Sequence, residues 1–259
     1  MVSAENPSWH AHGAKAVSIA LLLAVWYAIA WIPERSIFPP PHVVVMYLAE
    51  DVLTRPFWMH LAITLGRIFA AFALAMVIAV PVGILLGFSQ LFRSLFGSWV
   101  VIGLMIPSLV FIILSYTSFG LTETAAILGA ALPVVWVLTV NIWESAKAVD
   151  GKLVQMARVY GLDKFNVVRR VVLPQLAPPL MASARFGIGL IWKMVLFVEL
   201  IGRSNGVGYQ IEYYYQLFNM GRVLEYTVFF VAIMLLIEVV ILGGIERRLF
   251  RWRPAANLG

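Results

Sequence analysis

The sequence predicts an all-α membrane protein with six transmembrane helices and a polar loop between the fourth and the fifth. Of its 259 residues, 62% are apolar and only 12% are charged, whereas soluble domains are about half apolar and a quarter charged. The apolar residues gather in six runs, and a run of roughly 20 residues can cross a bilayer as a helix. We therefore expect residues 1–259 to form a single transmembrane domain.

Each predicted span is one apolar run. In chain order the spans are Ala16–Ile32, Leu61–Phe88, Trp99–Ser118, Thr122–Trp143, Leu176–Ile201 and Thr227–Ile245. Pro81 lies inside the second span, where neighbouring helices can satisfy the freed backbone groups. Pro107 and Pro133 predict possible kinks in the third and fourth spans.

The connections are read from proline, glycine and polar residues. Three prolines at 39–41 exclude a helix interior, and His42–Leu53 after them predicts a short helix. A tight turn at 119–121 joins the third and fourth spans. A longer loop at 202–225, rich in glycine and aromatic residues, joins the fifth and sixth.

The positions of lysine and arginine predict that both termini are cytoplasmic, because cytoplasmic loops carry an excess of these residues. With the N-terminus inside, the cytoplasmic side holds Lys15, Arg93, Lys147, Lys152, Arg158, Lys164, Arg169, Arg170, Arg247, Arg248, Arg251 and Arg253. The opposite side holds Arg35, Arg55, Arg203 and Arg222. The net charge of +6 therefore reflects orientation in a membrane, and we expect no nucleic-acid partner.

The first span has a second interpretation. Lys15, a short apolar run and the sequence Ala28-Ile29-Ala30 are also features of a cleaved signal peptide. Bulky residues around that point, Trp26 and Trp31 among them, favour a retained span.

Several classes of chemistry are absent from the sequence. The chain has no cysteine, which excludes disulfides and thiolate metal sites. It has no GxxxxGK[ST] phosphate loop, so it has no ATP site of that type. The four histidines, His10, His12, His42 and His60, lack metal-ligand spacing, and no catalytic constellation stands out. We expect a non-enzymatic chain without a metal or cofactor of its own.

The loop at 144–175 is the most informative segment. Its apolar positions recur at helical spacing and predict two short helices hinged at Gly161, since glycine adopts the left-handed conformation that ends a helix. Asp163 is placed to cap the second helix, with Asn166 three residues on, and Pro174 is expected to end it. A soluble partner that binds this loop would explain its polarity. The alternative is a pair of amphipathic helices that lie on the lipid headgroups.

This loop resembles the EAA loop of ABC importer permeases. The resemblance rests on Gln155-Met156-Ala157, three residues, Gly161, nine residues, and Val171-Val172-Leu173-Pro174. Its details are similar to the binding-protein-dependent type I branch for nitrate, sulfonates and taurine. Further ordered matches to that branch lie at 38–41, 60–67, 81–83, 87–89, 170–174, 206–209 and 246–252. Gln155 and Met156 depart from the family's glutamate and alanine, and residues 115–120 depart from its usual tryptophan-containing stretch.

The resemblance implies a bacterial inner-membrane permease that forms a homodimer. Its implied partners are two ATP-binding cassette subunits, which bind ATP and Mg, an extracytoplasmic solute-binding protein, and membrane lipid. The residues that it implies in coupling to the ATPase are Gln155, Met156, Ala157, Arg158, Gly161, Leu173 and Pro174.

Ionisable residues inside the spans are candidates for the translocation pathway, because an unpaired charge at that depth costs roughly 3 kcal/mol or more. The charged pathway candidates are Arg185, Lys193, Glu199 and Glu238, and Ser115, Tyr116 and Trp192 are expected to line the pathway with Lys193. An internal ion pair is the alternative for Arg185, Lys193 and Glu238, because the rise per residue places Glu238 between the other two in depth.

The outer end of the pathway is expected to be gated. The candidate gate residues are Gly206, Gly208, Tyr209 and Tyr213, helped by Glu199. Arg67 is interpreted as a side chain that reaches the outer headgroups.

The sequence thus predicts ATP-driven import of a small solute by alternating access. Lys193 and the aromatic residues favour an organic anion, such as a sulfonate, taurine or an aromatic acid, with nitrate also open. A secondary transporter or channel is one alternative, and a membrane-embedded enzyme is another. The absence of internal repeats and of a nucleophile, base or metal cluster speaks against them.

Overall fold

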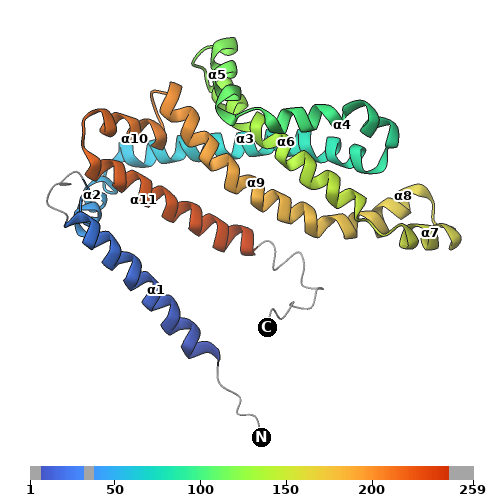
Figure 1. Ribbon diagram of the computed structural model, residues 1–259, viewed down its shortest axis with the longest axis horizontal. Helices are drawn as coiled ribbons and strands as arrows, with labels where there is room; N and C mark the ends of the chain where they lie inside the picture. Colours follow the sequence, from blue (N-terminus) through green and yellow to red (C-terminus); the bar gives the residue numbers. More distant parts are fainter. Residues whose placement is uncertain (1–6, 32–37, 245–259) are drawn as a thin grey trace, which may run out of the picture. The chain divides into compact units, whose positions relative to one another are not determined.

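A computed structural model describes residues 7–31 and 38–244 (Figure 1). The matched motif at 246–252 lies outside the described residues. The chain divides into two compact units, residues 1–58 with 210–231 (unit 1) and residues 59–209 with 232–259 (unit 2), and each is described by itself.

All regular elements in the described residues are helical. They are α1 (Pro7–Ala30), α2 (Pro41–Asp51), α3 (Arg55–Phe88), α4 (Gln90–Met105), α5 (Ser108–Phe119), α6 (Glu123–Lys147), α7 (Gly151–Val159), α8 (Lys164–Val167), the π-helix η2 (Val168–Val172), α9 (Leu173–Gly202), α10 (Val207–Gln216), α11 (Met220–Leu236) and the π-helix η3 (Ile237–Leu242). The all-α prediction is confirmed for this part of the chain, and α2 is the helix predicted at His42–Leu53.

In unit 2, α6 is the central helix. It packs along α9 (Figure 1) and also contacts α4 and α5. Of its most apolar stretch, 61% is buried, against 28% for α3. Small residues such as Ala126, Ala130 and Ala131 are fully buried on it. Such residues let helix backbones approach closely, which is how helices associate in lipid.

The predicted third span is broken. α4 and α5 meet at an angle of 96°, with Ile106 extended (ψ 124°) and Pro107 following at φ −56°. A proline disfavours the helical conformation of the residue before it, and this explains the break. The expectation of one helix over Trp99–Ser118 is therefore wrong. The kink predicted at Pro107 is a break between two separate helices.

Within residues 7–31 and 38–244, three helical stretches are long and apolar enough to cross a membrane: Arg55–Phe88, Glu123–Lys147 and Met220–Val240. The bent pair of α4 and α5 raises the number to four if it is counted as one span. The apolar part of α1, Ala16–Ala30, is shorter. The count of six spans stays a prediction.

In unit 1, aromatic and charged side chains hold α2 and the start of α3 to α11. The Phe57 ring lies 4.7 Å from that of Phe229 and 5.4 Å from that of Tyr226. Arg222 pairs with Asp51 at 2.7 Å and with Glu50 at 2.9 Å.

The predicted loop at 202–225 contains a helix. α10 occupies ten of its residues, between Gly206 (φ 109°) and Phe218 (φ 55°), whose positive φ values mark the turns on either side. Of the glycines that indicated a loop, Gly202, Gly206 and Gly221 lie outside α10, and Gly208 is its second residue.

Candidate functional site

The loop between α6 and α9 folds into a helix, an elbow and a second short helix. Asp150 caps α7 by accepting a hydrogen bond from the Lys152 backbone N–H at 2.8 Å. At the other end, the N–H of Gly161 donates to Arg158 and the N–H of Leu162 donates to Ala157, at 3.0 and 3.1 Å. This pair of bonds is the Schellman motif. Gly161 has φ 74°, so its predicted left-handed conformation is confirmed.

The second helix begins at the predicted position. Asp163 occupies the N-cap position of α8, and the Asn166 side chain donates a hydrogen bond to its carboxylate. This bond holds the pKa of Asp163 below its ordinary value, because it stabilises the ionised form.

Pro174 does not end a helix, contrary to the sequence prediction. α8, η2 and α9 form one continuous run from Lys164 to Gly202. The run passes through a π turn in which the Leu173 N–H donates to the Val168 carbonyl. The wider turn separates the ring of Pro174 from the preceding carbonyls, which it would meet in an α-helix. Leu173 and Pro174 are both exposed.

α7 presents apolar side chains outward. Val159 is 86% exposed, Tyr160 77% and Met156 52%, whereas Ala157 is buried beneath them. Gln155 and Arg158 are also exposed. Apolar side chains that are exposed together mark contact sites with proteins or membranes.

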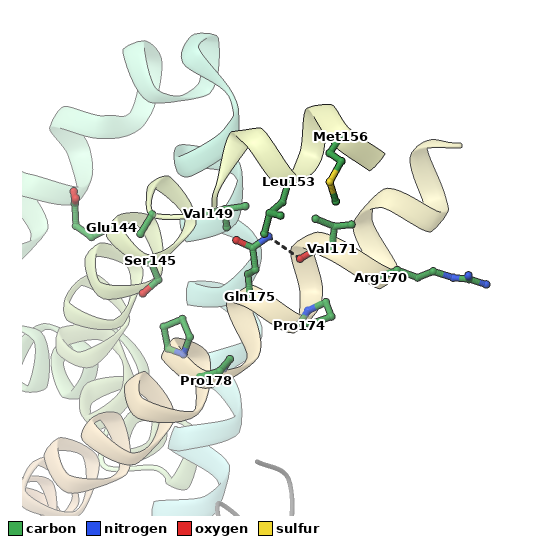
Figure 2. A pocket seen from close by; sticks show the side chains of 12 residues that line it. Glu144, Ser145, Val149, Leu153, Met156, Arg170, Val171, Pro174, Gln175 and Pro178 are labelled. Carbon is green, nitrogen blue, oxygen red and sulfur yellow. Dashed lines mark hydrogen bonds between the residues drawn. The ribbon is translucent and has the colours of Figure 1, made fainter. Parts of the chain in front are cut away.

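Beneath α7 lies a hollow of about 840 Å³ (Figure 2). It is lined by Glu144, Ser145, Ala148, Val149, Leu153, Met156, Arg170, Val171, Pro174, Gln175, Pro178 and Pro179. Gln175 bridges it: its carbonyl accepts from the Asp150 N–H and its amide donates to the Val171 carbonyl, both at 2.9 Å. Sequence reasoning missed Gln175, whose only signal is a lone amide in an apolar run. The bridge joins α9 to the start of α7.

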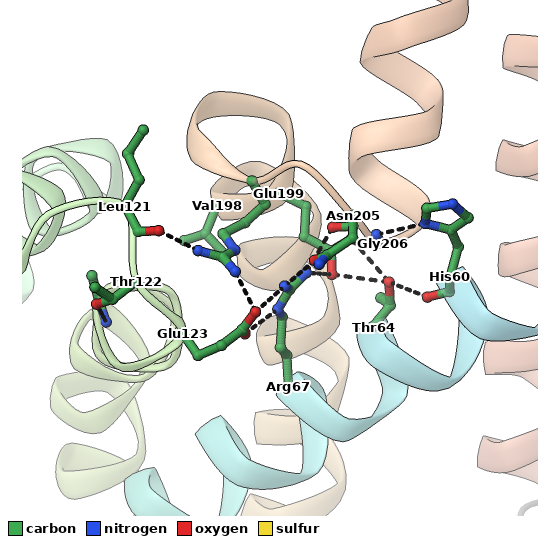
Figure 3. A network of polar contacts seen from close by, with 12 residues as sticks. His60, Thr64, Arg67, Leu121, Thr122, Glu123, Val198, Glu199, Asn205 and Gly206 are labelled. Atoms are coloured by element: carbon green, nitrogen blue, oxygen red, sulfur yellow. Dashed lines mark hydrogen bonds and ion pairs between the residues drawn. The ribbon is translucent and has the colours of Figure 1, made fainter. Parts of the chain in front are cut away.

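At the opposite end of α9, Arg67 of α3 is the centre of a polar cluster (Figure 3), here named the Arg67 network, in which Thr64, Arg67 and Glu199 are buried. Its members are Thr64, Arg67, Glu123, Glu199, Arg203 and Asn205. Arg67 lies 2.7 Å from Glu199 and 2.7 Å from Glu123, and donates to the Asn205 carbonyl at 2.9 Å. Arg203 also pairs with Glu123. The positive charges of the two arginines balance the negative charges of the two glutamates within the network.

The predicted role of Arg67 is wrong. Only 3% of this residue is exposed, so it does not reach toward headgroups. Residues of the motif at 60–67 instead form hydrogen bonds with the loop that follows α9. The Gly206 N–H donates to the His60 ring at 2.9 Å and the Val207 N–H donates to Thr64 at 2.8 Å.

Three of the predicted gate residues adjoin this network. The Gly208 N–H donates to Glu199 at 2.8 Å. A side chain at Gly206 would collide with the Glu199 carboxylate. The Tyr209 ring lies 6.1 Å from that of His60. Tyr213, in unit 1, contacts Tyr214, with the ring centroids 5.3 Å apart.

Three pathway candidates are buried rather than open to a channel within this chain. Ser115 donates to the Ala125 carbonyl at 2.8 Å, and Tyr116 donates to the Val198 carbonyl at 2.6 Å. Glu199 is fully buried in the Arg67 network. These contacts hold α5 against α6 and α9, and a pathway role for the three residues stays a prediction.

Of the other four candidates, three line a second hollow and Trp192 lies beside one of them, Lys193. The expected ion pair is present between Arg185 and Glu238, at 3.3 Å. The Lys193 ammonium lies 5.6 Å from the centre of the Trp192 ring. Arg185, Lys193 and Glu238 line the hollow, which has a volume of about 470 Å³. Among residues 7–31 and 38–244, no group of three or more histidine, aspartate or glutamate side chains is placed to hold a metal ion.

Comparison with known proteins gives a consistent result. Residues 79–252 match the family model described as binding-protein-dependent transport system inner membrane component. A protein provisionally named aliphatic sulfonates transport permease protein SsuC, from Escherichia coli (strain K12), is 30% identical, over 92% of this chain and 90% of that protein. The taurine transport system permease protein TauC of the same strain is 27% identical, over 91% and 88%.

Two further proteins extend the comparison. The bicarbonate transport system permease protein CmpB of Synechococcus elongatus is 26% identical, over 70% of this chain and 66% of that protein. Among solved structures, an inward-facing MetNI methionine ABC transporter is similar in fold. Its TM-score is 0.58 at 23% identity, covering 80% of this chain and 96% of that one.

Proposed function

This chain belongs to the family of binding-protein-dependent transport system inner membrane components, and from that membership we propose that it is the permease subunit of an ATP-driven importer. It takes up a small organic anion by alternating access. It is a multi-pass protein of the bacterial inner membrane with both termini in the cytoplasm. The partners are a second copy of this chain, two ATP-binding cassette subunits, which bind ATP and Mg, and an extracytoplasmic solute-binding protein.

The observation that carries the proposal is the geometry of α7 and Gly161. α7 is short, capped at both ends and followed by a glycine in the left-handed conformation. It is therefore a rigid helix that ends in a defined turn at Gly161. Its exposed Met156 and Val159 offer an apolar contact to a soluble ATPase. Arg158 and Gln155 flank that contact and are exposed with it.

Movement at this contact reaches the membrane through α9. The Gln175 bridge ties α7 to the start of α9, and the 30 residues of α9 extend about 45 Å at the usual helical rise. Its far end carries Glu199 and leads into the loop with Gly206 and Gly208. We assign this end, with Tyr209 and Tyr213, to the outer gate.

The solute class follows from relatives and from charge. The proteins named SsuC, TauC and CmpB carry sulfonate, taurine and bicarbonate in their names, and all three solutes bear an anionic group. Arg185 and Lys193 in α9 supply cations that suit such a group. This chain therefore imports a small anion.

Co-purification tests the proposal. The chain is expressed with the ATPase and solute-binding protein encoded beside it and extracted in detergent, and the ratio of subunits is measured. We expect one ATPase per permease chain. Gly161→Pro should lose the ATPase, because proline cannot adopt φ 74° and removes the N–H bonded to Arg158.

The matched control is Gly151→Ala. Gly151 begins α7 without a positive φ, and a side chain there meets nothing within 4 Å, so the ATPase should be retained. A folded chain that binds no ATPase would contradict the proposal and favour a secondary transporter or channel.

A further inference from the structure

The hollow of about 470 Å³ in unit 2 combines cations, one carboxylate and apolar side chains. Its lining residues are Met181, Ala182, Arg185, Phe186, Gly189, Leu190 and Lys193 from α9 and Glu238 from η3. Pockets of about 300–1,000 Å³ with few polar groups are typical of small-molecule sites. The hollow therefore has the size and the composition of a ligand site.

The two cations share one face of α9. Arg185, Gly189 and Lys193 are four residues apart, so they lie above one another along the helix. Each interval rises about 6 Å, which places Gly189 midway between the two charges. A side chain at Gly189 would meet no atom within 4 Å, so there is open space beside the backbone between the cations.

The charges of the hollow do not balance. Among the described residues that line it, Glu238 is the one carboxylate, and it pairs with Arg185 at 3.3 Å. The side chains of this pair are 38% and 49% exposed, so the pair is open to exchange with another anion. Among the described lining residues, two cations and one carboxylate leave one positive charge.

We propose that this hollow binds the anionic head group of the solute in transit. Lys193 and Arg185 hold a sulfonate or carboxylate beside Gly189, and Phe186, Leu190 and Met181 contact an apolar tail. The Glu238 carboxylate competes with the solute for Arg185. The entering solute displaces Glu238 from Arg185, and the return of Glu238 to Arg185 promotes release of the solute. The solute class is a small organic monoanion. This inference rests on the proposed function, since it assigns the solute site of that importer.

Thiol modification tests the charge of the hollow without knowledge of the solute, because the chain has no cysteine. Gly189→Cys is treated in detergent with an anionic reagent, sulfonatoethyl methanethiosulfonate, and with a cationic one, trimethylammonioethyl methanethiosulfonate. In each reaction the thiolate attacks the thiosulfonate sulfur, a disulfide forms and methanesulfinate leaves. The measured quantity is the ratio of the anionic rate to the cationic rate.

The reference is Gly151→Cys, an exposed position with equal free space for a side chain and outside the hollow. We expect the ratio at Gly189→Cys to be about tenfold higher than at the reference, because a cationic cleft concentrates anions. Lys193→Gln should lower the ratio and Glu238→Gln should raise it. A ratio equal to the reference, or one unchanged by Lys193→Gln, would overturn the inference.

Uptake by the reconstituted complex separates this inference from the proposed function. With radiolabelled ethanesulfonate, an organic monoanion, as the probe, ATP-driven uptake by the parent chain that Lys193→Gln leaves unchanged would overturn the site alone. An anion-selective hollow in a chain that binds no ATPase would overturn the proposed function and leave the anion site standing. Arg55→Gln, which removes an exposed cation that does not line the hollow, is the control for net charge.

Discussion

The Arg67 guanidinium lies 2.7 Å from the Glu199 carboxylate, although the two residues are 132 positions apart in the chain. Both side chains are almost fully buried, at 3% and 0% exposed. Together they join α3 to α9, and Glu123 extends the contact to α6. Two ion pairs of the same arginine thus hold three helices together at the end of α9.

Removal of one partner should strongly destabilise unit 2. We expect Arg67→Met to lower the free energy of unfolding by about 3–5 kcal/mol, because it leaves Glu199 buried without its cation. Unfolding in detergent, followed by tryptophan fluorescence, measures the change. Arg55→Met, at an exposed position, should change stability little.

A double variant separates the charge effect from packing. Arg67→Met with Glu199→Met removes the buried pair together, and part of the lost stability should return, because no single charge of that pair is left alone. Losses that simply add would show that the two residues act independently.

The elbow at Gly161 should be sensitive to a single methyl group. A side chain at Gly161 meets no atom within 4 Å, so Gly161→Ala acts only through the left-handed backbone, which costs roughly 1–2 kcal/mol. We expect the affinity for the ATPase to fall about tenfold, which corresponds to about 1.4 kcal/mol. Titration of the ATPase against detergent-solubilised permease measures it. Gly151→Ala should bind as the parent chain does, and equal losses in both variants would contradict the role of the elbow.

Gln175 should couple the ATPase to transport without binding it. Gln175→Leu removes both hydrogen bonds that join α9 to Asp150 and Val171 but leaves the exposed face of α7 unchanged. We expect ATPase binding to persist while ATP-driven uptake falls several-fold relative to ATP hydrolysis. Uptake that stays in proportion to hydrolysis would show that the bridge does not transmit motion.

The carboxylate of Asp163 should titrate at a lower pH than an ordinary aspartate, because Asn166 donates to it. A lowered folded-state pKa stabilises the start of α8 above the unfolded pKa of about 3.9, and this stability is lost as the pH falls through the folded value. The chain has three aspartates, Asp51, Asp150 and Asp163, so carboxyl-labelled protein can be followed by NMR. Asn166→Ala should raise the pKa of Asp163 toward the ordinary value, and an unchanged titration would contradict this contact.

Local patterns predicted much of this structure. The helix at 41–51, the turn at Gly120 and the elbow at Gly161 each follow from nearby proline or glycine residues. Helical rise alone predicted, as one of two interpretations, an ion pair among Arg185, Lys193 and Glu238, and Arg185 and Glu238 form one.

The parts that sequence missed depend on contacts between distant segments. Hydropathy finds apolar runs but not their direction, so the 96° break between α4 and α5 was expected only as a kink. Nothing near Arg67 indicates Glu199, and a lone arginine near the start of an apolar run therefore looked like a headgroup contact. The bridging role of Gln175 likewise cannot be read from the sequence, because it depends on the fold that brings Asp150 within hydrogen-bond distance.

Site-specific crosslinking can show whether α7 is the contact with the ATPase. In this cysteine-free chain, Val159→Cys and Leu53→Cys each carry a benzophenone maleimide at positions that are equally exposed, at 86%. On illumination of the assembled complex, we expect a crosslink to the ATPase from Val159→Cys and none from Leu53→Cys. A crosslink to the ATPase from Leu53→Cys, with none from Val159→Cys, would contradict both the coupling role of α7 and the orientation of the chain.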